Sequence, residues 1–403
     1  MDIKYFEGEK ITIKGKANKE GKRMSEKDIN QKYLNGKVRI VTEQARYPLN
    51  SILTMLSSGD YELHPEFQRR RRWNRIKQSR LIESFIMNVP IPPIFLYEQE
   101  FATYEVMDGL QRLTAIRDFY QDKYELSGLE FWPELEGYKY STLPKAVKQG
   151  IDRRYLSSII LLHETASTEE EAKKMKQLVF DRINSGGAKL EYQESRNALY
   201  HGKFNEVAER LSRNDYFCKI FDIPLQTDEE IDNPKFIPED LADNPMFQKM
   251  DDVEMVVRFF AMRYLGSLEG MPLKDFLDRF TEQANNLPAN VLLKYEDIFE
   301  KTIKLVYDVY GDKAFCLLKL NTRTNEWSLG KIPAKILYDP IMFVLSQLVE
   351  KRDPLIEKKE EIFQATLDLM KNENSLFSGR KASKSDIQKR IDKFEDLFSR
   401  FLR

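Results

Sequence analysis

Apolar positions in the first half of the chain change spacing from one segment to the next. Apolar residues recur at intervals of three and four positions from Leu49 and again from about Asn74, and each run predicts an amphipathic helix. Residues 94–97 and 104–107 are rich in β-branched and aromatic side chains and flank a short polar stretch, which predicts a hairpin. Residues 159–162 form an uninterrupted apolar run, typical of a buried strand. The mixture predicts an α+β domain over residues 46–215.

The second half of the chain has a different pattern. Residues 216–252 are acidic and contain prolines with little periodicity, which predicts a linker or a long loop. From Val253 onward helical spacing continues almost to the last residue, so residues 253–403 are predicted to form an all-α domain without a catalytic residue pattern. Residues 1–45 are lysine-rich with scattered glycines and are predicted to form a charged N-terminal arm.

Composition limits the classes of protein that fit. No apolar run approaches the roughly 18 residues that a membrane span needs, and the first residues lack the apolar core of a signal peptide. The two cysteines, Cys218 and Cys316, give neither a disulfide framework nor metal-ligand spacing, so a reducing cytoplasm is expected. The net charge of −1 says little about partners, because a neutral total can contain local basic patches.

Histidine is scarce, and this excludes several kinds of enzyme. The three histidines are His64, His163 and His201, so a histidine-dependent nuclease of the His-Asn-His type is excluded from the C-terminal half. The chain contains neither a G-x-S-x-G nucleophile elbow nor a G-x-x-x-x-G-K-[ST] phosphate loop.

The stretch most suggestive of chemistry runs from residue 104 to 116. A predicted strand turns at Asp108-Gly109 and continues as a helix whose first turn contains Gln111 and Arg112. Free backbone N–H groups at such a helix start favour an anion, and an arginine fork beside them makes a phosphate grip. The alternative is an ordinary tight turn with a surface arginine.

A second basic feature is the run Arg69, Arg70, Arg71 and Arg72, which ends at Trp73. Clustered arginines between aromatic residues are typical of nucleic-acid surfaces. A solvated basic face that also lines a phosphate site explains the same run, and the sequence leaves both interpretations open.

Several motifs together resemble one family. The segments are 64–73 (P-x-[FY]-Q-R-x-x-x-W), 81–93 (L-I-x-S followed by P-x-P-P), 108–112, 180–187 (F-x-R-[IL]-N-x-G-G) and 194–197 (E-x-R-N). Residues 108–112 match its D-G-Q-Q-R signature at four of five positions, with Leu110 in place of the first glutamine. The chain thus resembles, over roughly residues 47–215, the N-terminal domain of GmrSD-type modification-dependent restriction systems, placed in the ParB/sulfiredoxin-like superfamily.

The resemblance implies a ParB-like nucleotide-binding core in which this turn meets the triphosphate of an NTP, with Mg²⁺. It implies that Arg112 contacts phosphate, that Gln111 orients a phosphate oxygen or a water, and that Asp108 binds the cation or fixes the turn. Further residues implied to bind the nucleotide are Gln68, Arg69, Gly109, Arg182, Asn184, Gly186 and Gly187. The prediction that Arg70, Arg71 and Arg72 contact DNA rests on the arginine run itself and not on the resemblance.

Three functions stay open. The first is a prokaryotic defence protein that binds and hydrolyses an NTP, recognises DNA that is modified or of phage origin, and acts with a separate nuclease subunit. The second is a sensor of nucleotide or modified DNA without turnover, which the replacement by Leu110 would suit if the missing glutamine positions water. The third is a nuclease that uses the ParB-like core itself. The base of the NTP, the DNA modification and the oligomeric state are not determined by the sequence.

Overall fold

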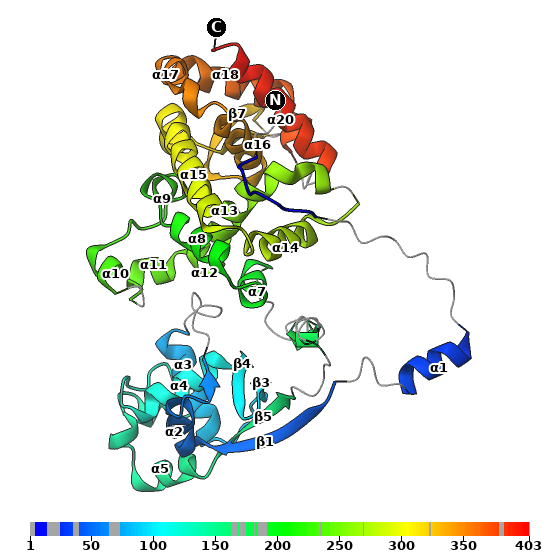
Figure 1. Ribbon diagram of the computed structural model, residues 1–403. Helices are drawn as coiled ribbons and strands as arrows, with labels where there is room; N and C mark the ends of the chain where they lie inside the picture. Colours follow the sequence, from blue (N-terminus) through cyan, green and yellow to red (C-terminus); the bar gives the residue numbers. More distant parts are fainter. Residues whose placement is uncertain are drawn as a thin grey trace. The chain divides into compact units, whose positions relative to one another are not determined.

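The chain divides into two compact units (Figure 1). The sheet unit comprises Lys19–Leu190, and the helical unit comprises Met1–Asn18 together with Glu191–Arg403. The computed structural model describes residues 5–13, 25–34, 40–63, 73–162, 168, 172, 175–176, 178–180, 182–183, 192–233, 236–268, 270–321, 324–378 and 383–402.

A five-stranded mixed sheet forms the centre of the sheet unit. Its strands are β1 (Thr42–Pro48), β2 (Tyr61–Glu62), β3 (Ile94–Glu100), β4 (Thr103–Asp108) and β5 (Tyr155–Leu161), in the order β1-β5-β3-β4-β2. The pairs β1–β5 and β3–β4 are antiparallel, whereas β5–β3 and β4–β2 are parallel. The predicted hairpin is therefore confirmed as β3–β4, and its register places Phe95 opposite Asp108 at the end of the hairpin away from its turn.

Helices cover one face of this sheet. They include α2 (Ile52–Ser57), α3 (Arg75–Ile86), α4 (Leu110–Tyr120) and α5 (Lys145–Asp152), and α1 (Glu26–Leu34) precedes the first strand. Leu96 and Val106 of the sheet share a core with Ile82 of α3 and Leu113 of α4. Helix α3 begins where the Oδ1 atom of Asn74 accepts the N–H of Lys77 at 3.0 Å, a side-chain cap that satisfies one free donor of the first turn.

The helical unit is built around a long helix, α15. Its helices are α7 (Tyr192–Leu199), α8 (Lys203–Leu211), α9 (Asp215–Phe221), α10 (Asp228–Asp232), α11 (Glu239–Asp243), α12 (Pro245–Gln248), α13 (Asp251–Ala261), α14 (Leu273–Ala284), α15 (Ala289–Tyr310), α16 (Lys335–Ser346), α17 (Arg352–Glu357), α18 (Lys359–Asn372), α19 (Asn374–Phe377) and α20 (Lys384–Ser399). Phe260 and Tyr295 stack in the core with ring centroids 4.3 Å apart. The predicted α+β class with a helical C-terminal part is confirmed.

Two features of the helical unit were not predicted from the spacing of apolar residues. The segment predicted as a linker or long loop, 216–252, contains α10, α11, α12 and most of α9. Between α15 and α16 the chain forms an antiparallel hairpin of β6 (Cys316–Asn321) and β7 (Glu326–Pro333), within the region predicted to be all-helical. No helix in the part of the chain that the structure describes is long and apolar enough to cross a lipid bilayer.

The N-terminal segment 5–13, which the charge pattern assigned to an arm, packs on the helical unit through Glu9. The carboxylate of Glu9 accepts hydrogen bonds from Arg263 at 3.0 and 3.1 Å and from the hydroxyls of Tyr264 and Tyr295 at 2.8 Å each. Burial raises the pKa of Glu9, but Arg263 together with the hydrogen bonds from Phe6 and Tyr264 outweighs burial, so the pKa lies below its ordinary value. The sheet unit is thus an insertion between two parts of the helical unit.

Candidate functional site

The turn after β4 requires glycine at its second position. Gly109 caps α4 with a φ of 102° and a ψ of 6°, in the left-handed region that L side chains rarely adopt. A Cβ atom at this position would lie 2.3 Å from Cγ2 of Ile94 on β3. Both constraints hold the strand end directly against the start of α4, so residues 110–112 form the first turn of the helix at the end of the sheet.

Arg112 connects this turn to the proline segment before β3. Its Nη2 donates to Oδ2 of Asp108 at 2.6 Å, and its Nη1 donates to the carbonyl oxygens of Pro92 and of Pro93, the latter at 3.2 Å. The side chain is only 11% exposed, and burial lowers the pKa of Arg112, although Asp108 opposes this shift. The guanidinium remains charged at neutral pH, as arginine does in proteins.

Gln111 connects the same turn to a third motif. Its Oε1 accepts the backbone N–H of Trp73 at 3.2 Å, just before α3. Residues from three of the motif segments, 64–73, 81–93 and 108–112, therefore meet around one helix N-terminus. Sequence spacing alone did not assign Pro92 and Pro93 a place in the site, because their contribution is a pair of backbone carbonyls.

Leu110, where the resemblance expects a glutamine, points into the core. The residue is 7% exposed and belongs to the apolar cluster that contains Leu113 and Ile116 of the same helix. The replacement therefore lies at a buried position of the turn and not on its exposed surface.

The fourth motif is described only in part. Phe180 is buried and Arg182 is exposed, while Gln68, Arg69, Arg70, Arg71, Arg72, Asn184, Gly186 and Gly187 lie outside the described residues. Lys176, one turn before Phe180, pairs with Glu105 on β4 and lies 5.5 Å from the ring centroid of Tyr97. These contacts place Lys176 on the sheet face opposite α3 and α4, because Glu105 lies on the other side of β4 from the core residue Val106.

Arg196 and Asn197 of the E-x-R-N segment belong to the helical unit. Arg196 is buried, and its Nε donates to Oδ1 of Asp278 at 2.8 Å, while Asn197 donates to Glu209 at 2.8 Å. Arg196 also lies 4.0 Å from Glu254, which pairs with Lys335 at 2.8 Å. This network ties α7 to three other helices, so the segment has a packing role in the structure.

No group of three or more His, Cys, Asp or Glu side chains able to hold a metal occurs among the described residues. Asp108 is the carboxylate at the turn, and it is paired with Arg112. Mg²⁺ in nucleotide sites is commonly held by one or two carboxylates together with the phosphates, so Asp108 suits such a cation as a single protein ligand.

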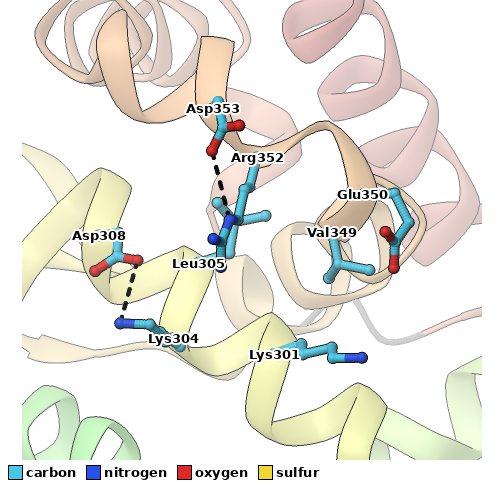
Figure 2. A pocket seen from close by; sticks show the side chains of 8 residues that line it. All are labelled: Lys301, Lys304, Leu305, Asp308, Val349, Glu350, Arg352 and Asp353. Atoms are coloured by element: carbon cyan, nitrogen blue, oxygen red, sulfur yellow. Dashed lines mark ion pairs between the residues drawn. The ribbon is translucent and has the colours of Figure 1, made fainter.

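A hollow in the helical unit offers a second place to look for a ligand (Figure 2). It has a volume of about 280 Å³ and is lined by Lys301, Lys304, Leu305, Asp308, Val349, Glu350, Arg352 and Asp353. Its cations are already paired with acids: Lys304 lies 3.8 Å from Asp308 and Arg352 lies 3.5 Å from Asp353. Charges of both signs balance here, so the hollow does not favour an anionic ligand.

Comparison with known proteins assigns the segment that carries this site. Residues 49–201 match the family described as the GmrSD restriction endonuclease, N-terminal domain. This segment is a GmrSD-type N-terminal domain. The comparison found no significant match among curated proteins or among solved structures. The match covers every described residue of the turn, of the proline segment and of α3, and its presence implies a restriction-type defence protein.

Proposed function

We propose that this protein is a prokaryotic restriction-type defence protein, acting in the cytoplasm, that binds and hydrolyses an NTP at the Asp108–Arg112 turn. Nucleotide turnover is coupled to recognition of modified or phage DNA and to a separate nuclease subunit. The observation that carries the proposal is the meeting of three motif segments around the N-terminus of α4, within a GmrSD-type domain.

The chemistry of the turn supports a polyphosphate ligand. The first N–H groups of an α-helix have no partner inside the helix and carry the positive end of its dipole. Arg112 adds a charge to that end, and its Nε–H and second Nη2–H make no hydrogen bond to any described residue. Phosphoryl transfer depends mainly on such donors around the developing charge.

Each residue of the turn has a proposed role. Gln111 orients a phosphate oxygen or the attacking water from the first turn of α4, and Gly109 brings the backbone close to the phosphates. Asp108 and Arg112 hold each other, and Mg²⁺ held by Asp108 would neutralise charge on the phosphates. The carbonyl oxygens of Pro92 and Pro93 accept hydrogen bonds from Arg112 and keep it in place.

One observation favours the second candidate, a sensor that binds nucleotide without turnover. Arg112 donates three hydrogen bonds to protein groups, namely the carbonyls of Pro92 and Pro93 and the carboxylate of Asp108. These N–H groups are therefore not available to a ligand. An arginine engaged in this way positions the turn, and it neutralises a developing charge less effectively than one aimed directly at the phosphate.

The deciding experiment measures NTP binding and phosphate release by the full chain, with Mg²⁺, with and without DNA. Gln111→Ala and Arg112→Ala are compared with Arg117→Ala, which removes an arginine from the opposite end of the same helix. Circular dichroism checks that each variant folds.

Release by the wild type and by Arg117→Ala that disappears in Gln111→Ala supports the NTPase. Binding without release supports the sensor. Absence of binding to any NTP by the wild type contradicts both candidates.

A further inference from the structure

A loop of the sheet unit, residues 127–132, is fixed to α3 along its length. The Oγ atom of Ser79 accepts the N–H of Ser127 at 3.0 Å, and the Nε of Arg80 donates to the carbonyl of Gly128 at 3.3 Å. Gly128 adopts a φ of 68° and lies against Ile76, one turn before Arg80. These contacts already fix the path of the first half of the loop.

The second half is held by a single carboxylate. Glu83 of α3 is buried, and it accepts the backbone N–H groups of Glu130, Phe131 and Trp132 at 3.0, 2.7 and 2.9 Å. A buried carboxylate is costly unless donors surround it, and hydrogen bonds to a charged acceptor are among the strong ones. The three successive peptides are therefore rigidly oriented.

This rigid backbone presents two aromatic side chains to solvent. Phe131 is 67% exposed and Trp132 is 39% exposed, and Ile76 on the neighbouring helix is also exposed. Large apolar side chains that are gathered on a surface and held on ordered backbone typically mark an interaction site. Exposed aromatic rings can stack on the bases of a nucleic acid, whatever the base.

The charge around these rings favours a polyanion over a protein partner. The solvent-facing charged residues of α3 are Arg75, Lys77 and Arg80, because its single acid, Glu83, is buried under the loop. Glu130 is neutralised by Arg80 at 2.7 Å, which leaves Arg75 and Lys77 as the cations for phosphate. Glu134 and Glu136 are the acids that follow Trp132, and the carboxylate of Glu136 accepts the backbone N–H of Leu129 at 2.7 Å. Arg75 and Glu83 lie eight positions apart, about 12 Å along the helix, so the cations and the anchored loop lie within a few nucleotides of one another.

We infer that this aromatic face, formed by Phe131 and Trp132 with Arg75 and Lys77, binds unpaired bases of single-stranded DNA. The rings stack on bases while the two cations of α3 contact the backbone phosphates. The inference rests on DNA as a partner in the proposed function and goes further by naming the surface and the unpaired form of the DNA.

The test measures the affinity of the full chain for a fluorescent oligo-thymidine of about 20 nucleotides and for a duplex of equal length. The main variant is the double substitution Phe131→Ala with Trp132→Ala. The matched control is Phe101→Ala, because Phe101 is 96% exposed on the β3–β4 turn of the same unit. A conservative variant, Phe131→Tyr with Trp132→Phe, keeps both rings.

The double alanine variant should lose at least about fivefold in affinity for the single strand, since stacking on one base contributes that much or more. The slope of affinity against salt should stay unchanged in it, because no phosphate contact is removed. Phe101→Ala and the conservative variant should bind like the wild type. In a background of Trp73→Phe and Trp327→Phe, Trp132 is the remaining indole, and its fluorescence should be quenched by the oligonucleotide.

Equal affinity of the double alanine variant and the wild type overturns the inference, as does a wild type that binds the duplex but not the single strand. A wild type that binds neither the single strand nor the duplex overturns it as well. NTP binding at the Asp108 turn is measured separately, so failure here leaves the nucleotide part of the proposed function intact.

Discussion

Removing one partner of the buried pair Arg258–Asp339 should strongly destabilise the helical unit. The Nε of Arg258 on α13 donates to Oδ1 of Asp339 on α16 at 3.0 Å, and its Nη2 donates to Oδ2. The two side chains are 7% and 4% exposed. Burial lowers the pKa of Arg258, but Asp339 together with Glu254 and Tyr338 more than reverses this, so the pKa lies above its ordinary value. The pair is thus held by charge as well as by geometry.

The chosen substitution is Asp339→Asn, which keeps the shape of the side chain and removes its charge. Breaking a buried pair by neutralising one partner costs about 3–5 kcal/mol, because the other charge stays buried. Asn keeps one acceptor, and Glu254 lies 3.9 Å from Arg258, which reduces the loss. Arg390 is also buried and is stabilised by the charge of Asp339, so removing that charge adds to the loss of stability. We expect a loss of about 4 kcal/mol in the free energy of unfolding.

The assay is urea unfolding followed by tryptophan fluorescence. In a Trp73→Phe, Trp132→Phe background the remaining indole is Trp327 on β7, so the signal reports on the helical unit alone. One probe in one unit matters because a chain with two units need not unfold in one step. For a unit of this size the expected loss also corresponds to a fall in Tm of about 8–16 °C.

The control is Asp297→Asn, which breaks an exposed pair on α15. Lys301 and Asp297 lie 2.7 Å apart with side chains 52% and 59% exposed, and such pairs contribute less than about 1 kcal/mol. A loss for Asp339→Asn no larger than that for Asp297→Asn would refute the reasoning, since burial would then not determine the strength of the pair.

Three further predictions concern the turn and the N-terminal segment. Gly109→Ala should destabilise the sheet unit by about 2 kcal/mol or more, because its φ of 102° is unfavourable for alanine and the new Cβ meets Ile94. Thermal unfolding checks this with Gly150→Ala as the control, because Gly150 of α5 has no positive φ and a Cβ there meets no atom within 4 Å. Leu110→Gln, which restores the family's residue, should lower the free energy of unfolding by about 2 kcal/mol, because a polar side chain is then buried. Phosphate release should not increase, and an increase would show that the position faces the nucleotide. Because the pKa of Glu9 lies below its ordinary value of 4.5, its stabilising contribution is present above that value and is lost as the pH falls through the lower folded-state pKa. The difference in Tm between wild type and Glu9→Gln should therefore shrink on acidification, and a constant difference would contradict the assignment.

The sequence by itself determined the features whose causes are local. The glycine turn between β4 and α4, the hairpin β3–β4 and the proline stop after α3 each follow from residues within a few positions of one another. The order of the motifs likewise indicated the GmrSD-type domain, whose match covers residues 49–201. Backbone sterics and helix or strand periodicity act over this short range, so they can be recognised without coordinates.

Only the tertiary structure decided which partners the polar side chains have. Arg112 was predicted to contact phosphate, and this stays a prediction; the structure shows instead that it contacts Asp108 and two proline carbonyls about 20 positions away. Glu9 finds its side-chain donors 254 to 286 positions along the chain, and Glu83 is buried by peptides 47 to 49 positions away. A charged residue has the same letter in the sequence whether it is solvated or buried. Its role depends on which distant donors and acceptors the packing of apolar faces brings within hydrogen-bonding distance, and that is set by the whole fold.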